Sequence, residues 1–136
     1  MGILSRFGDI MAANINALLD KCEDPEKMID QYLRKAKEDF AKVKSETAAV
    51  MAEESRTKRL LDVAQDKVDE YAAAARSAVA AGNDDDARKL LTKKAEVEAA
   101  RDTALSTYQV AHNNANKMKQ LYNKLSQDIQ SLEARR

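Results

Sequence analysis

The stretch that decides the fold runs from Ile29 to Ala78 and reads IDQYLRKAKEDFAKVKSETAAVMAEESRTKRLLDVAQDKVDEYAAAARSA. Alternating steps of four and three residues from Ile29 give fifteen positions, of which twelve are apolar, and no Gly or Pro interrupts them. An apolar seam that repeats every 3.5 residues is typical of a helix that supercoils along another helix. The seam positions are Ile29, Leu33, Ala36, Phe40, Val43, Thr47, Val50, Glu54, Thr57, Leu61, Ala64, Val68, Tyr71, Ala75 and Ala78.

A second seam of the same period follows a short break at Gly82 and Asn83. Gly82 suits the left-handed conformation that ends a helix, and Asn83 or Asp84 suits the cap of the next helix. Eleven of thirteen positions in the second seam are apolar. They are Leu90, Lys94, Val97, Arg101, Ala104, Tyr108, Ala111, Ala115, Met118, Tyr122, Leu125, Ile129 and Leu132. Before the first seam, Asp24 suits an N-cap and Pro25 the first helical position.

These signals predict an all-α fold, a long antiparallel two-helix coiled-coil hairpin preceded by a short amphipathic helix. The hairpin domain covers residues 25–136, with helices over 25–81 and 85–135 and a turn at 82–84. Folding about Asn83 brings Glu54 opposite His112 and places Arg101 near Gln65, where it can pair with Asp62 or Asp66. Because polar residues in a seam commonly set the alignment of a coiled coil, we expect these polar breaks to fix the register. The residues of this register set are Glu54, His112, Arg101, Asp62 and Asp66.

The other predicted domain, residues 1–24, holds an amphipathic helix over residues 2–20. Placed at 100° per residue, its apolar side chains fall within an arc of roughly 140° that only Asn14 breaks. The predicted lipid-facing set is Ile3, Leu4, Phe7, Ile10, Met11, Ile15 and Leu18. Two interpretations stay open: this face packs on the hairpin or on a second copy, or it lies in a membrane interface. Since Arg6 is the only cation before Lys21, lipid binding would rest on apolar insertion and favour loosely packed or curved bilayers.

Several classes of function are disfavoured by composition. The chain has 136 residues with 23 basic and 23 acidic side chains, and no segment has the basic excess of a nucleic-acid binder. One His, one Cys and three Gly support no catalytic, cofactor or metal motif, and three adjacent Asp at 84–86 are best explained as helix capping. No run approaches the roughly 20 apolar residues of a membrane span. We interpret Cys22 as a small apolar residue at the helix joint, and a single cysteine fits a reducing, cytoplasmic setting.

Three blocks of sequence carry a family resemblance. They are Met1-Gly2-Ile3-Leu4-Ser5-Arg6-Phe7-Gly8-Asp9-Ile10, Asn14-Ile15-Asn16-Ala17-Leu18-Leu19-Asp20-Lys21 and Glu23-Asp24-Pro25-Glu26-Lys27-Met28. With the turn Ala81-Gly82-Asn83-Asp84, these blocks resemble the phage shock protein A and plastid vesicle-inducing protein family of the ESCRT-III superfamily. The resemblance covers the whole chain and is most specific at the N-terminus.

The resemblance implies a non-enzymatic membrane-stress protein that is cytoplasmic and peripheral on the inner face of the cell membrane. It implies an N-terminal helix that inserts into anionic or loosely packed lipid, and self-assembly that supports or remodels the bilayer. In the family, further helices after the hairpin lock neighbours together. Because this chain ends at Arg136, it is either a piece of a longer protein or a natural short form. A dimer through leftover apolar residues is an alternative to polymers, and these residues are Met51, Leu60, Ala72, Val79, Leu91 and Leu121.

Two other functions stay in view. In a regulatory binding module, the hairpin would capture and inhibit an AAA+ transcription activator, or contact a membrane stress sensor, as the resemblance also implies. That interpretation needs residues 1–20 docked, whereas the membrane interpretation needs them exposed in the free protein. A plain structural coiled coil is the third possibility, and it would tolerate the loss of Phe7.

Overall fold

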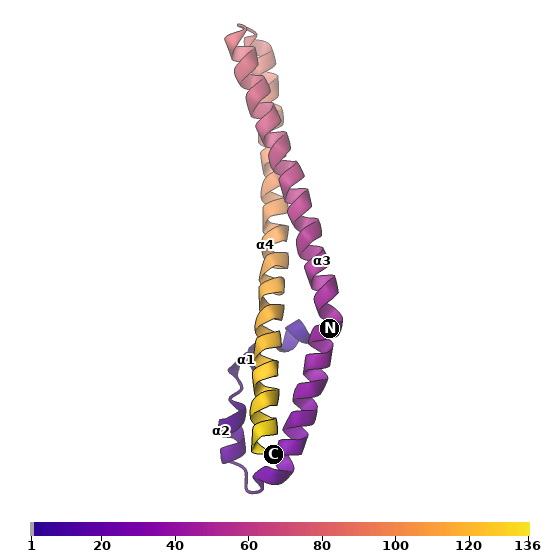
Figure 1. Cartoon of the computed structure of the whole chain (residues 1–136). Coiled ribbons are helices and arrows are strands. Elements are labelled where there is room, and N and C mark those ends of the chain that lie inside the picture. The colour runs from indigo at the N-terminus through magenta and orange to yellow at the C-terminus, as the bar shows by residue number, and fades with distance from the viewer. Residues whose placement is uncertain (1) are drawn as a thin grey trace. The chain divides into compact units, whose positions relative to one another are not determined.

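The computed structural model describes residues 2–136, which form helices and contain no strand. The elements are the 3-10 helix η1 (Ile3–Arg6), α1 (Phe7–Ala12), α2 (Ile15–Asp20), α3 (Pro25–Ala80) and α4 (Asp84–Arg135). The long helices α3 and α4 pack against each other as an antiparallel hairpin, which confirms the predicted fold class (Figure 1). Both helices begin and end within one residue of the predicted bounds.

The two seams face the interior of the hairpin. Every position of the first seam is buried or half-buried, because an apolar repeat of 3.5 residues keeps one side of α3 toward its partner. In the second seam only Tyr122 is exposed, with 46% of its surface accessible, although its ring packs against Phe40 at a centroid distance of 5.0 Å. The polar seam residue Thr57 can be buried because its hydroxyl is satisfied by donating to carbonyl oxygens of its own helix, at Glu53 and Glu54.

The turn between α3 and α4 is a Schellman motif built on a left-handed glycine. Gly82 has a φ of 77° and donates its N–H to Val79, while Asn83 donates to Ala78. The carbonyl of Asn83 then accepts from the N–H of Ala87 in the first turn of α4. At the other end of the hairpin, Asp24 precedes Pro25 at the start of α3. The turn therefore satisfies carbonyl groups at the end of α3, and Asn83 accepts the first hydrogen bond of α4.

The chain divides into two compact units. One unit contains the described residues up to Met51 together with Asn113–Arg136, so it holds the N-terminal elements and the open end of the hairpin. The other unit is Ala52–His112, which contains the turn. In the second unit the two helices are joined by polar contacts as well as by the seams, including a hydrogen bond of 2.9 Å from Arg101 to Gln65.

The N-terminal segment, residues 2–20, differs from the single helix expected there. Ala13 and Asn14 adopt extended conformations that separate α1 from α2. The Oδ1 atom of Asn14 accepts a hydrogen bond of 3.1 Å from the N–H of Ala17, so this residue caps α2. Asparagine favours a cap over a helix interior, which explains why the one residue that breaks the apolar arc also begins a new helix.

Candidate functional site in the N-terminal segment

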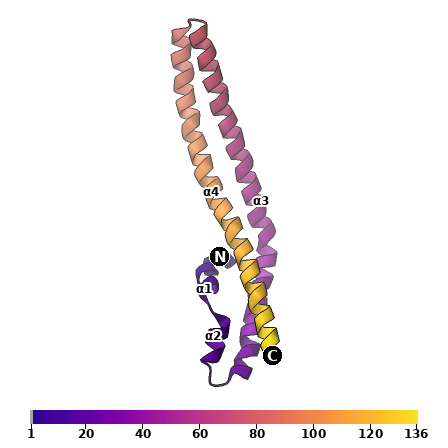
Figure 2. The ribbon, with the colours of Figure 1, turned by 60° about the vertical axis from the view of Figure 1, so that its left-hand side comes forward.

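The N-terminal segment packs its apolar face on the hairpin (Figure 2). Ile3 and Ile10 are buried, with 2% and 6% of their surface exposed. They join a cluster that is completed by residues of α3 and α4: Val43, Met118, Leu121 and Leu125. Leu4, Phe7 and Met11 are half-buried against the same cluster. The structure therefore brings five members of the predicted lipid-facing set together on the hairpin.

The rest of the segment packs nearer the open end of the hairpin, and here Leu19 is buried instead of the expected Leu18. Leu19 is fully buried in a cluster with Ile29, Leu33, Ala36 and Leu132, and Ile15 packs against it. Leu18, which helical periodicity places in the apolar arc, is 41% exposed. The predicted arc holds only for one continuous helix. The break at Ala13 and Asn14 turns α2 so that Leu19 faces the hairpin instead.

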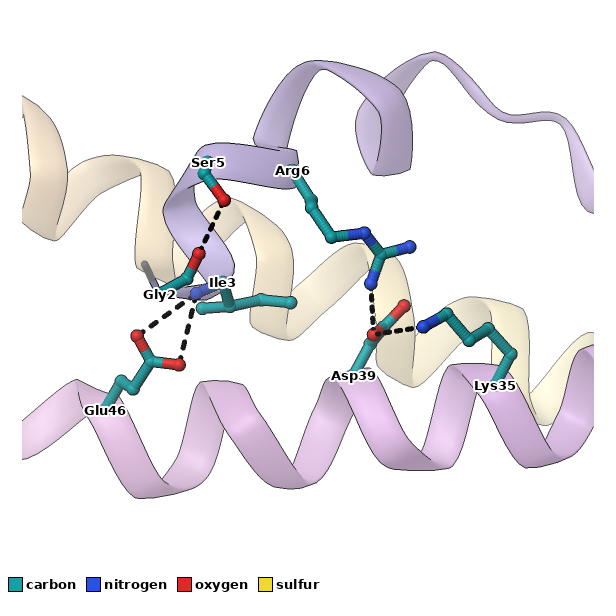
Figure 3. Close-up of polar contacts among 7 residues, drawn as sticks. All are labelled: Gly2, Ile3, Ser5, Arg6, Lys35, Asp39 and Glu46. Carbon is teal, nitrogen blue, oxygen red and sulfur yellow. Dashed lines mark hydrogen bonds and ion pairs between the residues drawn. The ribbon is translucent and has the colours of Figure 1, made fainter.

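Two carboxylates of α3 hold the beginning of the segment (Figure 3). The Arg6 guanidinium donates to the Asp39 carboxylate at 2.5 Å, and Lys35 approaches the same oxygen at 3.7 Å. The N–H of Ile3 donates to both carboxylate oxygens of Glu46, each at 3.1 Å. Neither acid stands out in the sequence, because both belong to charge patterns that are ordinary for an exposed helix face.

Further contacts lie along the segment. The Lys117 ammonium lies 5.3 Å from the centroid of the Phe7 ring, close enough for a cation–π contact. Arg135 donates to the carboxylate of Asp20 at 3.0 Å and lies 3.4 Å from the oxygens of Asn16. Polar side chains of α4 thus border the segment along its exposed edge.

Cys22 follows the segment at the joint with α3. Its Sγ atom donates to the carbonyl of Leu18 at 3.1 Å, and the thiol is half-buried and free. Desolvation, and after it the nearby Cys22, raise the pKa of the Tyr32 phenol above its ordinary value.

Only part of the predicted register set is in contact across the hairpin. The Glu54 carboxylate lies 2.6 Å from Nδ1 of His112, and the Tyr108 hydroxyl is 3.5 Å from the same nitrogen. Arg101 donates to Gln65 and to the adjacent Asp102. Asp62 instead pairs with Lys58 one turn away on α3, at 3.0 Å. Within residues 2–136, no ion pair joins Arg101 to Asp62 or Asp66. The Arg101 guanidinium instead donates hydrogen bonds to Gln65 and Asp102.

The remaining groups of the site offer no reactive constellation. No cluster of three or more His, Cys, Asp or Glu side chains suited to a metal ion occurs among residues 2–136. Across the same residues, no helix has the length and apolarity that crossing a bilayer requires. What the segment presents is an amphipathic face, and in this structure that face is covered by the hairpin.

Comparison with known proteins gives consistent matches along the chain. The sequence model of the PspA/IM30 family matches residues 2–136. A phage shock protein A homolog of Bacillus subtilis is 51% identical over 136 residues, which are 100% of this chain and 60% of that protein. The membrane-associated protein Vipp1 of Synechocystis is 31% identical over 117 residues, 84% of this chain and 44% of that one. The chloroplastic membrane-associated protein VIPP1 of Arabidopsis thaliana is 33% identical over 107 residues, 79% and 32% of the two chains.

Proposed function

The chain belongs to the PspA/IM30 family, and we propose that it is a non-enzymatic membrane-stress protein that binds the inner face of the cytoplasmic membrane. It spans 60% of the length of its Bacillus relative and less of the Vipp1 proteins, so this role covers the part of such proteins that the hairpin and the N-terminal segment supply. Relatives that are named membrane-associated support the choice of a lipid partner.

The observation that carries the proposal is the apolar face of the N-terminal segment. Ile3, Ile10, Phe7 and their neighbours form one apolar cluster, with polar side chains on the opposite side. Such a face binds a bilayer in the plane of the interface, where the free energy comes from buried apolar area. Because the same side chains are packed on α3 and α4, the segment must leave the hairpin before it enters lipid.

Self-assembly is the second part of the proposed function. Exposed apolar side chains remain on the outer faces of the hairpin and provide surface for contacts between copies; among them are Leu60, Val79 and Leu91, each at least half exposed. Leu121, which the sequence predicts to be part of this leftover surface, is fully buried beneath the N-terminal segment and is unavailable while the segment is docked. We propose that copies associate through the outer faces and thereby support or reshape the bilayer.

The test is co-sedimentation of the chain with small and with large unilamellar vesicles of one composition. We expect the chain to sediment with vesicles, and to favour the small ones, because their curved surface exposes more packing defects to an apolar segment with few cations. Circular dichroism verifies that the helices are folded under the same conditions. A folded chain that stays in solution with both kinds of vesicle would count against membrane binding by this part of the protein.

The docked segment also favours a second candidate function. A regulatory binding module, whose hairpin captures and inhibits an AAA+ transcription activator or contacts a membrane stress sensor, needs residues 1–20 packed in the free protein. The packing of Ile3, Ile10 and Leu19 on the hairpin agrees with that requirement. Deletion of residues 2–20 separates the two functions: loss of vesicle binding alone supports the membrane role, whereas loss of binding to the protein partner supports the module.

For the hairpin itself, we propose that Glu54 and His112 help to hold α3 and α4 in register. The two side chains are half-buried and face each other across the hairpin at 2.6 Å. An interhelical contact of this kind is satisfied in one alignment and broken when a helix slips by one turn, so it favours a single register.

A double-mutant cycle with Glu54→Gln and His112→Gln measures this contact. We expect a coupling free energy of about 1 kcal/mol in urea unfolding, since the pair is a charge-assisted contact with partial exposure to solvent. The matched control is the exposed pair of Lys58 and Asp62 on α3, for which Lys58→Gln and Asp62→Asn should couple by less than about 0.5 kcal/mol. Equal coupling in the two cycles would remove the case for a register contact.

A further inference from the structure

We propose that Asp39 and Glu46 form an acidic latch that keeps the N-terminal segment docked and so limits its access to lipid. This inference rests on the proposed membrane function and adds a control element to it. Asp39 and Glu46 lie on the face of α3 that receives the segment, and each holds a different group of it: the Arg6 guanidinium and the Ile3 N–H (Figure 3).

Asp39 is the only buried charged residue among residues 2–136, with 3% of its surface exposed. A carboxylate removed from water must be paired, and the cation that reaches it from outside its own helix is Arg6. Release of the segment returns Asp39 to water and leaves it beside Lys35, four residues earlier on α3. The regained hydration offsets much of the lost ion pair, so the contact selects the docked position without making it irreversible.

Glu46 contacts the start of the segment by accepting hydrogen bonds from a backbone N–H, and not by pairing with a charged side chain. The N–H of Ile3 has no acceptor within its own helix, and Glu46 supplies one. Gly2 permits this approach, because a Cβ atom added there would collide with Oε1 of Glu46. A Cβ atom at this position requires the flexible end of the Glu46 side chain to shift, and we expect this shift to weaken its hydrogen bonds to Ile3.

The latch and the bilayer compete for the same side chains. Ile3, Phe7 and Ile10 pack on the hairpin in the docked state, and the proposed function places them in lipid in the released state. The apparent affinity for vesicles is then the intrinsic affinity multiplied by the fraction of chains whose segment is released. Weakening the latch raises this fraction and should therefore increase membrane binding, whereas a purely structural contact would leave binding unchanged or reduce it.

Asp39→Asn tests the latch in the full 136-residue chain. Hydrogen exchange in the absence of lipid should accelerate across residues 3–20, because the amide cannot balance the charge of Arg6. The apparent affinity for small anionic vesicles should rise about tenfold. Gly2→Ala, which changes no charge, should raise it about threefold by displacing Glu46. Circular dichroism verifies that both variants retain the helical hairpin.

Asp62→Asn is the matched control, because Asp62 also pairs with a lysine four residues earlier on α3 but touches nothing in the N-terminal segment. It should change neither exchange nor vesicle affinity. Unchanged or slower exchange in Asp39→Asn would overturn the latch, and so would faster exchange with unchanged vesicle affinity. If exchange becomes faster but neither the original chain nor the variant binds vesicles, the proposed membrane function fails, and the latch loses its role as a control of lipid access.

Discussion

Replacing Leu121 by alanine is expected to lower the free energy of unfolding by about 2–5 kcal/mol, because the side chain is fully buried and its removal leaves a cavity. Leu121 lies in the cluster that joins α3, α4 and the N-terminal segment, with Ile3, Ile10 and Val43 among its members. Urea unfolding followed by circular dichroism measures the loss. Hydrogen exchange across residues 3–20 should also accelerate, since the cavity lies beneath the docked segment.

Leu91→Ala is the matched control for this prediction. Both leucines lie on α4, so the two substitutions have the same effect on helix propensity, but Leu91 is 51% exposed. We expect it to cost less than about 1 kcal/mol, because little apolar surface returns to water. Similar losses for the two variants would contradict the packing of the N-terminal segment over Leu121.

The hairpin could be predicted from the sequence because its information is local and repetitive. Each seam position adds to the same 3.5-residue period, and Gly82 and Asn83 provide a turn that allows the second seam to return along the first. A fold about Asn83 also places Glu54 opposite His112, and these two side chains are in contact. Errors at single positions, such as the exposed Tyr122, do not change the pattern as a whole.

The N-terminal segment was harder to predict because its structure depends on partners that are distant in sequence. Helical periodicity placed Leu18 on the apolar face, but the cap formed by Asn14 interrupts the helix and Leu19 is the buried residue. The pairing of Arg6 with Asp39 spans 33 residues, and no local pattern distinguishes Asp39 from the exposed acids of α3. An amphipathic face shows that something covers it, but not whether the cover is lipid or protein.

Phe7→Glu is expected to weaken vesicle binding by about 100-fold or more, since burying a carboxylate in an apolar interface costs several kcal/mol. The docked state should tolerate the change better than the lipid-bound state. Phe7 is only half-buried on the hairpin, and Lys117, now over its ring, could pair with the new carboxylate. Circular dichroism should therefore remain helical while co-sedimentation is lost.

Ser5→Glu separates the position of the charge from the charge itself. Ser5 is exposed on the polar side of the segment, so this variant has the same net charge as Phe7→Glu and the same repulsion from anionic lipid. We expect it to sediment with vesicles nearly as well as the original chain. Equal loss in both variants would mean that net charge controls binding, and equal retention would mean that the membrane contact lies outside the apolar face. Only a selective loss in Phe7→Glu assigns the anchor to the side chains that the hairpin covers.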